Sequence, residues 1–221
     1  RALFKISTQF MIGLSATPQR DDGLSKVFYW FLGPIRYSKI IERDQIITVK
    51  MIRCEGAEPW YDPILNVRGK ANVPSMLTRL SEYPDRNNFI VTQVTKLSDE
   101  GRNILVLSGR TAHVKELTAL LIDRGIDAGF IMGCSQKKKS EKEEMKLSLN
   151  CQVIVGTYQS VSEGFDCDRL DTLVLATPVK KITQSIGRIL RKKRYQLQPL
   201  IIDIEDKFSS FKSQGSTRRR I

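Results

Sequence analysis

From Ser81 onward, short apolar segments alternate with helical ones, and this alternation constrains the fold more than any other feature of the chain. Aliphatic segments typical of buried strands fall at residues 104–108, 128–132, 152–156, 172–176 and 200–204. Segments with helical spacing lie between or before them, at residues 85–97, 111–124, 140–149 and 183–190. This order predicts βαβ units, and therefore an α/β fold with a parallel sheet and helices on both faces. Ligands of such sheets bind outside the carboxyl ends of the strands, so polar residues that follow strands are the candidate site residues.

The first 80 residues are less regular. Residues 9–15 (QFMIGLS) predict a short buried strand, and residues 22–31 predict a helix that Gly33-Pro34 ends. Residues 45–53 are rich in β-branched side chains and predict another strand. Residues 55–74 hold three prolines and two glycines without a clear period, which indicates a loop or small insertion.

The charge points to a polyanionic partner. The net charge is +12, and residues 180–194 hold seven cations and no acid. Acidic membranes, acidic proteins and nucleic acid are all possible partners of such a chain, and nucleic acid is the commonest. A solvated basic face and a basic tail from about residue 215 would also account for the excess. Four cysteines without a CxxC pair and a single histidine argue against a metal site or a disulfide framework. The apolar runs are too short to span a membrane.

The most distinctive cluster is QSIGRILR, at residues 184–191. Arg188 and Arg191 are three residues apart and therefore share one face of a helix, while Gly187 allows a close backbone approach. Guanidinium groups keep their charge and grip phosphate with paired hydrogen bonds, which suits a γ-phosphate during transfer. Taken alone, the cluster could equally be a basic helix in water.

Three further clusters follow expected strands. In residues 156–166, the Thr157 hydroxyl could hold a nucleic-acid phosphate, and Gly164 and Asp166 could receive a nucleotide; a polar loop with Asp166 as a helix cap is the alternative. Residues 108–111 (SGRT) could present a helix N-terminus and a cation to a phosphate, with Thr111 as a plain N-cap. Residues 13–20 (GLSATPQR) form a turn whose hydroxyls could relay hydrogen bonds, or simply a strand end.

In this order and spacing, the four clusters resemble the motifs of superfamily 2 helicases. Residues 15–17 match the SAT motif that ends the first motor lobe, and residues 107–110 fall where the fourth motif lies. Residues 156–166 resemble the fifth motif, and residues 184–191 fit the QxxGRxxR sixth motif at every fixed position. The finer likeness, in GLSATPQRDDGL and FLGPI, is to DNA helicases of the repair and transcription branch, and to their relatives in large cytoplasmic DNA viruses.

The resemblance implies a RecA-like second motor lobe at residues 35–221, preceded by the end of the first lobe and a hinge at residues 1–34. ATP with Mg²⁺ would bind between the lobes, held mainly by a P-loop and an acidic motif that this sequence lacks. Because the sequence also starts without methionine, we expect a piece of a longer protein that does not hydrolyse ATP by itself. The implied roles are γ-phosphate contact by Arg188 and Arg191; nucleotide binding by Gly164, Asp166, Gln184 and Gly187; nucleic-acid contact by Ser108, Arg110 and Thr157; and coupling by Ser15 and Thr17.

The predicted function is therefore an ATP-dependent motor on DNA, with RNA as the other candidate, whose partner is the first lobe of the same protein. A binding or docking module without motor activity would explain the charge, although not the motif spacing. A translocase that does not unwind shares the motifs. The cysteine usage indicates the reducing interior of a cell. The resemblance implies the host cytoplasm or virion if the protein is viral, and the nucleus if it is cellular.

Overall fold

The computed structural model describes residues 9–15, 23–38, 46–56, 60–132, 147–162, 167–179, 195–206 and 211. The chain divides into two compact units, Arg1–Arg43 and Asp44–Ile221, and each is described by itself.

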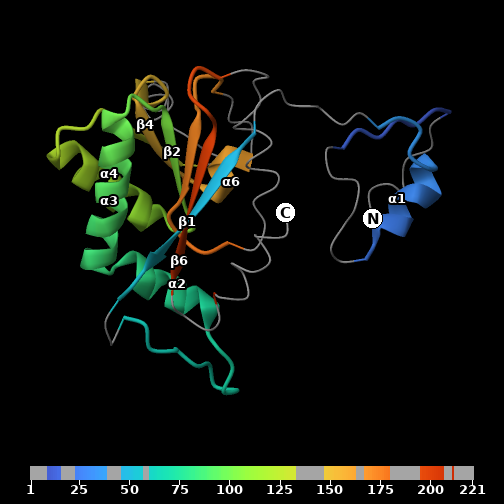
Figure 1. The fold of residues 1–221 in the computed structure, drawn as a ribbon. Coiled ribbons are helices and arrows are strands. Elements are labelled where there is room, and N and C mark those ends of the chain that lie inside the picture. Colours follow the sequence, from blue (N-terminus) through green and yellow to red (C-terminus); the bar gives the residue numbers. More distant parts are fainter. Residues whose placement is uncertain are drawn as a thin grey trace. The chain divides into compact units, whose positions relative to one another are not determined.

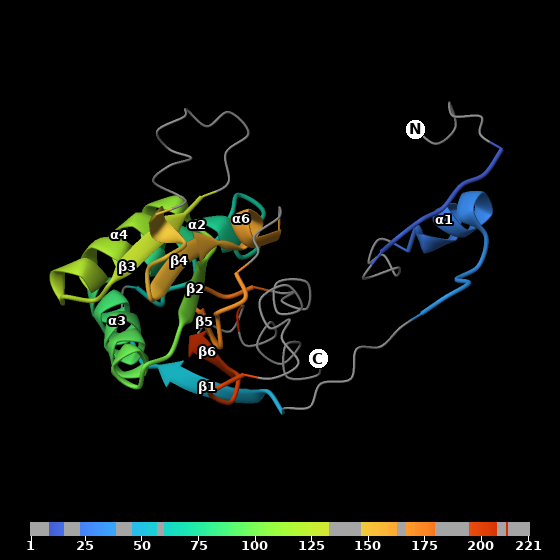
Figure 2. The same ribbon diagram turned by 90° about the horizontal axis from the view of Figure 1, so that it is seen from above.

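The second unit is built on a six-stranded sheet in which all neighbouring strands run parallel (Figures 1 and 2). The predicted α/β fold with a parallel sheet is confirmed. In spatial order the strands are β1 (Thr48–Cys54), β6 (Leu200–Asp206), β5 (Thr172–Leu175), β2 (Ile104–Ser108), β4 (Val153–Thr157) and β3 (Ala128–Ile131).

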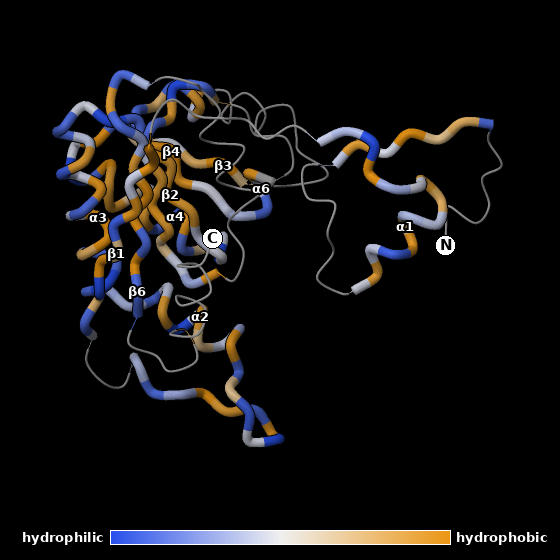
Figure 3. The backbone as a smooth tube through the Cα atoms, turned by 45° about the vertical axis from the view of Figure 1, so that its right-hand side comes forward, coloured by the Kyte–Doolittle hydropathy of each residue, from blue (hydrophilic) through white to orange (hydrophobic). Residues whose placement is uncertain are grey.

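Apolar side chains cover both faces of the sheet, because successive residues of a strand point to opposite faces. In β2, Ile104 and Val106 join one buried cluster, while Leu105 and Leu107 join the other. Helices α3 (Pro84–Asp99) and α4 (Thr111–Asp123) contribute to the first cluster, and α6 (Tyr158–Ser162) contributes to the second. Figure 3 shows the hydrophobic residues concentrated along the central strands. Each fully buried aliphatic side chain stabilises the fold by roughly 1.5–3 kcal/mol.

The segment between β1 and α3 is more ordered than its sequence predicts. Residues 73–74 were expected to belong to a loop, but a helix, α2 (Val73–Ser81), begins there, and the Asn72 side chain caps it by accepting from Ser75 N. Pro74 fits because the first helical turn needs no amide donor at that position. Leu65 and Ala71 form an antiparallel bridge. We call residues 64–72 the 64–72 hairpin.

In the first unit, helix α1 (Ser25–Leu32) ends at Gly33, whose φ of 75° favours glycine. The predicted strand at residues 9–15 is wrong: these residues form no strand, and Leu14 is 95% exposed. A strand needs a neighbour to accept its backbone hydrogen bonds, and none of the described residues forms β pairing with this segment. The predicted helix at 183–190 and most of the one at 140–149 lie outside the described residues.

Candidate functional site

The carboxyl ends of β2, β4 and β5 form the edge of the sheet at which the sequence predicts ligands. Ser108 ends β2 and Thr157 ends β4, and the two residues are register partners in adjacent parallel strands. The structure therefore brings together two residues that the sequence assigns to nucleic-acid contact from positions 49 apart.

Ser108 is fully buried, and its hydroxyl forms hydrogen bonds that hold the loop after β2. Its Oγ lies 2.9 Å from His113 Nδ1 and accepts from Arg110 N at 3.2 Å. His113 Nε2 lies 2.9 Å from Asn87 Oδ1, and Asn87 donates through Nδ2 to Ser81 O and Glu116 Oε1. This arrangement makes Nε2 the donor of the ring and Nδ1 the acceptor from Ser108. Ser108 thus shapes the loop with its side chain, because the hydroxyl points inward.

Burial, and to a lesser degree the positive charge of Arg86, lowers the pKa of His113 to about 3. The imidazole is therefore neutral near pH 7 and keeps its hydrogen-bonding pattern. This histidine has no role in the sequence-based prediction, although its position five residues after Ser108 is the signal that could have suggested a contact.

Arg110 connects the end of β2 to α2. Its guanidinium donates from Nε to Thr78 Oγ1 at 3.0 Å, from Nη2 to Pro74 O at 2.7 Å and from Nη1 to Gly109 O at 3.3 Å. Five N–H donors are available in a guanidinium, so these three bonds leave capacity for a phosphate oxygen. Arg110 also occupies the N-cap position of α4, which the sequence assigned to Thr111; Thr111 is the first helical residue.

Thr157 forms a capping box with Ser160 at the start of α6. Ser160 N donates to Thr157 Oγ1 at 3.1 Å, and Thr157 N donates to Ser160 Oγ at 3.1 Å. The Thr157 hydroxyl, which the sequence predicts to bind phosphate, therefore also caps α6. Thr157 is half-buried, and its hydroxyl hydrogen is not used by the capping bond.

Thr177 forms hydrogen bonds that link the loops after β2, β4 and β5. The sequence did not predict a role for it. Gly109 N donates to Thr177 Oγ1 at 2.8 Å, and Tyr158 donates from its hydroxyl to Thr177 O at 2.7 Å. These bonds tie the loop after β5 to those after β2 and β4. The available signal was a hydroxyl residue directly after a predicted strand, as at Ser108 and Thr157.

The remaining predicted site residues are placed less fully. Ser15 is exposed and lies in the first unit. Seven sequence predictions lie outside the described residues: Thr17, Gly164, Asp166, Gln184, Gly187, Arg188 and Arg191. The basic segment 180–194 connects Val179, just after β5, to the residues that precede β6.

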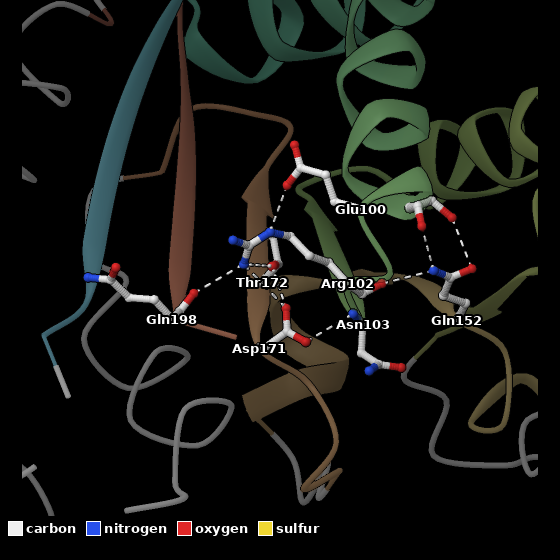
Figure 4. Close-up of polar contacts among 8 residues, drawn as sticks. Glu100, Arg102, Asn103, Gln152, Asp171, Thr172 and Gln198 are labelled. Atoms are coloured by element: carbon white, nitrogen blue, oxygen red, sulfur yellow. Dashed lines mark hydrogen bonds and ion pairs between the residues drawn. The ribbon is translucent and has the colours of Figure 1, made fainter. Parts of the chain in front are cut away.

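At the amino ends of the strands, a second network of hydrogen bonds joins the loops that precede the strands (Figure 4). Arg102 donates from Nη1 to Thr172 Oγ1 at 3.2 Å and to Gln198 O at 3.1 Å, while Asn103 N donates to Asp171 Oδ2 at 3.1 Å. Gln152 donates to Ser98 O and Arg102 O. These residues join the amino ends of the strands, opposite to the carboxyl ends at which ligands of parallel sheets bind.

Comparison with known proteins finds viral helicases that are similar to this chain. No protein-family model matches the chain. Over 97% of its length, the chain is 34% identical to a protein of Acanthamoeba polyphaga mimivirus described as an ATP-dependent RNA helicase, and it covers 42% of that protein. It is 28% identical, over 100% of its length, to a protein of Invertebrate iridescent virus 6 described as a helicase, and covers 51% of it. These likenesses support a C-terminal RecA-like lobe of a superfamily 2 helicase.

The fold of this helicase lobe has a counterpart among solved structures. T4 UvsW superposes with a TM-score of 0.57 at 22% identity, over 79% of this chain and 39% of UvsW. The lobe spans about half the length of the curated viral relatives it matches. Among the described residues, no helix has the length and apolar character needed to cross a membrane.

Proposed function

We propose that this helicase lobe is the second half of an ATP-driven motor that moves along nucleic acid. The observation that carries the proposal is the likeness to viral helicases along nearly the whole chain. The order of the sequence motifs supports it, because the loops after β2 and β4 hold two of them side by side at the ligand-binding edge.

In this proposal ATP and Mg²⁺ bind between this lobe and a P-loop lobe. Arg188 and Arg191 contact the γ-phosphate, where an arginine finger contributes roughly 10³–10⁵ to the rate. The nucleotide also meets residues of the fifth and sixth motifs, namely Gly164, Asp166, Gln184 and Gly187. Ser15 and Thr17 couple the ATP site to the strand, and closing and opening of the lobes moves the strand.

The tracked strand is held through its phosphates. Arg110 offers its remaining guanidinium donors and Thr157 its hydroxyl, while Ser108 fixes the loop that carries Arg110. Contacts to phosphate carry no sequence information, as movement along a strand requires. DNA is our first candidate because of the motif likeness, and RNA is the second because the mimivirus relative is described as an RNA helicase.

The proposal is tested with single-stranded DNA and RNA of the same sequence, titrated with salt. A lone lobe makes few contacts, so we expect a Kd of about 10⁻⁴–10⁻⁶ M and a log–log salt slope near −0.7 per phosphate contact. Arg110→Ala should weaken binding to every sequence alike and make the slope shallower by about 0.7.

Thr78→Ala is the matched control, because it removes a partner of Arg110 without removing the charge. It should leave the salt slope unchanged. Equal losses in the two variants would mean that Arg110 only anchors α2. Tight, salt-insensitive binding to one oligonucleotide would favour a sequence-specific binding module over a motor lobe.

A further inference from the structure

Asn87, in the first turn of α3, is fully buried and uses both groups of its side-chain amide. Its Nδ2 donates to Ser81 O at 2.9 Å and to Glu116 Oε1 at 3.0 Å, and its Oδ1 lies 2.9 Å from His113 Nε2. Ser81 is the last residue of α2, whereas Glu116 and His113 belong to α4, which packs beside α3 on one face of the sheet (Figure 1). Asn87 therefore joins three helices by hydrogen bonds.

The donors and acceptors of this network follow one direction. Both contacts of the Asn87 Nδ2 group are to a carbonyl or carboxylate oxygen, which accept, so the amide oxygen is turned towards His113. His113 then carries its hydrogen on Nε2, which leaves Nδ1 to accept from the Ser108 hydroxyl at 2.9 Å. Since the hydroxyl hydrogen is used there, the Ser108 oxygen is left to accept from Arg110 N at 3.2 Å. The orientation of one buried amide thus sets a bond to the backbone of Arg110.

A second connection runs from Asn87 to the side chain of Arg110 through α2. Asn87 holds the last residue of this helix, Ser81. Earlier in the same helix, Pro74 O at 2.7 Å and Thr78 Oγ1 at 3.0 Å accept from the guanidinium. The Thr78 hydroxyl is itself oriented, because it donates to Pro74 O at 3.1 Å. Arg110 is therefore held at its backbone by the end of β2 and at its side chain by α2, and Asn87 is connected to both supports.

Burial makes this network sensitive to the loss of any member. Asn87, Ser108 and His113 are each at most 1% exposed. Removing one partner leaves a buried donor or acceptor unsatisfied, which costs more than the lost bond contributed. Arg110, by contrast, is partly exposed and keeps guanidinium donors for a further oxygen. The network therefore links a buried amide of α3 to a cation that can reach a phosphate.

We propose that Asn87 is a positioning residue for the contact between Arg110 and a nucleic-acid phosphate. It fixes the loop after β2 through His113 and Ser108, and it fixes α2 through Ser81, so that the guanidinium is held in place before the strand binds. Asn87 is too deeply buried to touch the strand itself. This inference rests on the proposed motor function and deepens it, because it assigns the placement of one phosphate contact to a residue of α3.

The test is a double-mutant cycle between Asn87→Ala and Arg110→Ala. Fluorescence anisotropy measures the affinity of the 221-residue chain for single-stranded DNA. Alone, Asn87→Ala should weaken binding about three-fold, because the cation remains but is no longer held in place. In the Arg110→Ala background it should cause no further loss. Equal losses in the two backgrounds would overturn the proposal, since Asn87 would then affect binding without acting through Arg110.

Ser98→Ala is the matched control, because Ser98 is also a buried polar residue of α3, and its bond to Gln152 lies at the amino ends of the strands. It should lower stability and leave DNA affinity unchanged. A loss of affinity as large as that of Asn87→Ala would assign both effects to stability and would contradict a positioning role.

A second variant tests the same network where Asn87→Ala does not fold. Ser108→Ala removes the acceptor of Arg110 N, so it should also weaken binding about three-fold and have no effect in the Arg110→Ala background. A loss that persists in that background would count against the network as a whole.

A measurement without nucleic acid separates this inference from the proposed function. Hydrogen exchange of the Arg110 amide, which bonds to the Ser108 oxygen, should be about ten-fold faster in Asn87→Ala than in wild type and unchanged in Ser98→Ala. If wild type binds DNA and this exchange rate does not change in Asn87→Ala, the positioning role alone is overturned. If wild type binds no DNA, the proposed function fails, and Asn87 then positions no phosphate contact.

Discussion

His113 lies beneath the loop that follows β2, and its protonation should govern how the lobe responds to acid. The folded state holds the pKa of this imidazole at about 3, whereas the unfolded chain has the ordinary value of about 6.5. Above pH 6.5 both states are neutral, so His113 adds no pH dependence there. As pH falls from 6.5 towards 3, only the unfolded chain takes up the proton, and stability falls by at most about 1.4 kcal/mol per pH unit.

We therefore expect His113→Gln to flatten the loss of stability between pH 6.5 and pH 4. The variant cannot take up that proton in either state, although it should be less stable than wild type at pH 7 because the bonds to Ser108 and Asn87 change. Urea unfolding at several pH values measures both effects. Parallel pH profiles for wild type and variant would show that His113 is protonated in the folded lobe.

At the same scale, sequence patterns find the residues at a strand end but not the direction of their side chains. Ser108 and Thr157 were both predicted for the site, and they are register partners. The burial of the Ser108 hydroxyl against His113 depends on α4 packing over β2, which spacing along the chain does not reveal. Thr177 follows a predicted strand, which is a local signal, but its bond to Gly109 depends on the lateral order of β2 and β5.

Among the elements, α3 and β6 are joined by a buried ion pair. Arg86 donates from Nε to Asp206 Oδ1 at 2.7 Å and from Nη2 to Oδ2 at 2.9 Å, and both side chains are fully buried. Asp206→Asn would leave the Arg86 charge without its counter-charge, so the free energy of unfolding should fall by roughly 3–5 kcal/mol. Chemical denaturation measures this change.

Glu205→Gln is the control, because its partner Arg53 is 75% exposed and lies 3.5 Å away. Glu205 itself is 12% exposed, but solvent screens the charge of its exposed partner, so this change should cost less than Asp206→Asn. Replacing both buried partners, as Arg86→Met with Asp206→Leu, should recover much of the stability lost in Asp206→Asn. A small effect of Asp206→Asn alone would mean that water reaches Arg86.

Helices and strands can be predicted where the hydrophobic pattern of the segment itself indicates them. Residues 104–108 and 111–124 were predicted within one residue of β2 and α4, because apolar runs and helical stripes are local properties. Helix α2 also has such a stripe, in Val73, Met76 and Leu80, but the nearby prolines obscured it. The segment 9–15 has a strand-like sequence, yet strand formation needs a paired neighbour that the sequence cannot supply locally.

At the scale of the whole molecule, ATP hydrolysis should require more than this lobe. The 221 residues contain no GxxxxGK[ST] motif to hold the phosphates, and the lobe covers 42% and 51% of two viral relatives. We expect the purified chain to show no ATP turnover in a phosphate-release assay. Joined to a P-loop lobe, it should support turnover that nucleic acid stimulates.

In that two-lobe protein, Arg191→Ala should reduce ATP turnover by about 10³–10⁵ and leave nucleic-acid affinity nearly unchanged, because in the proposed role the guanidinium stabilises charge that develops only during phosphoryl transfer. Lys192→Ala removes a cation from the same basic segment at a position that the QxxGRxxR motif does not fix, so it should affect turnover far less. Loss of binding with normal turnover would instead assign Arg191 to the nucleic-acid track. Turnover by the single lobe that survives Arg191→Ala would contradict a shared ATP site, since hydrolysis would then require neither a P-loop lobe nor Arg191.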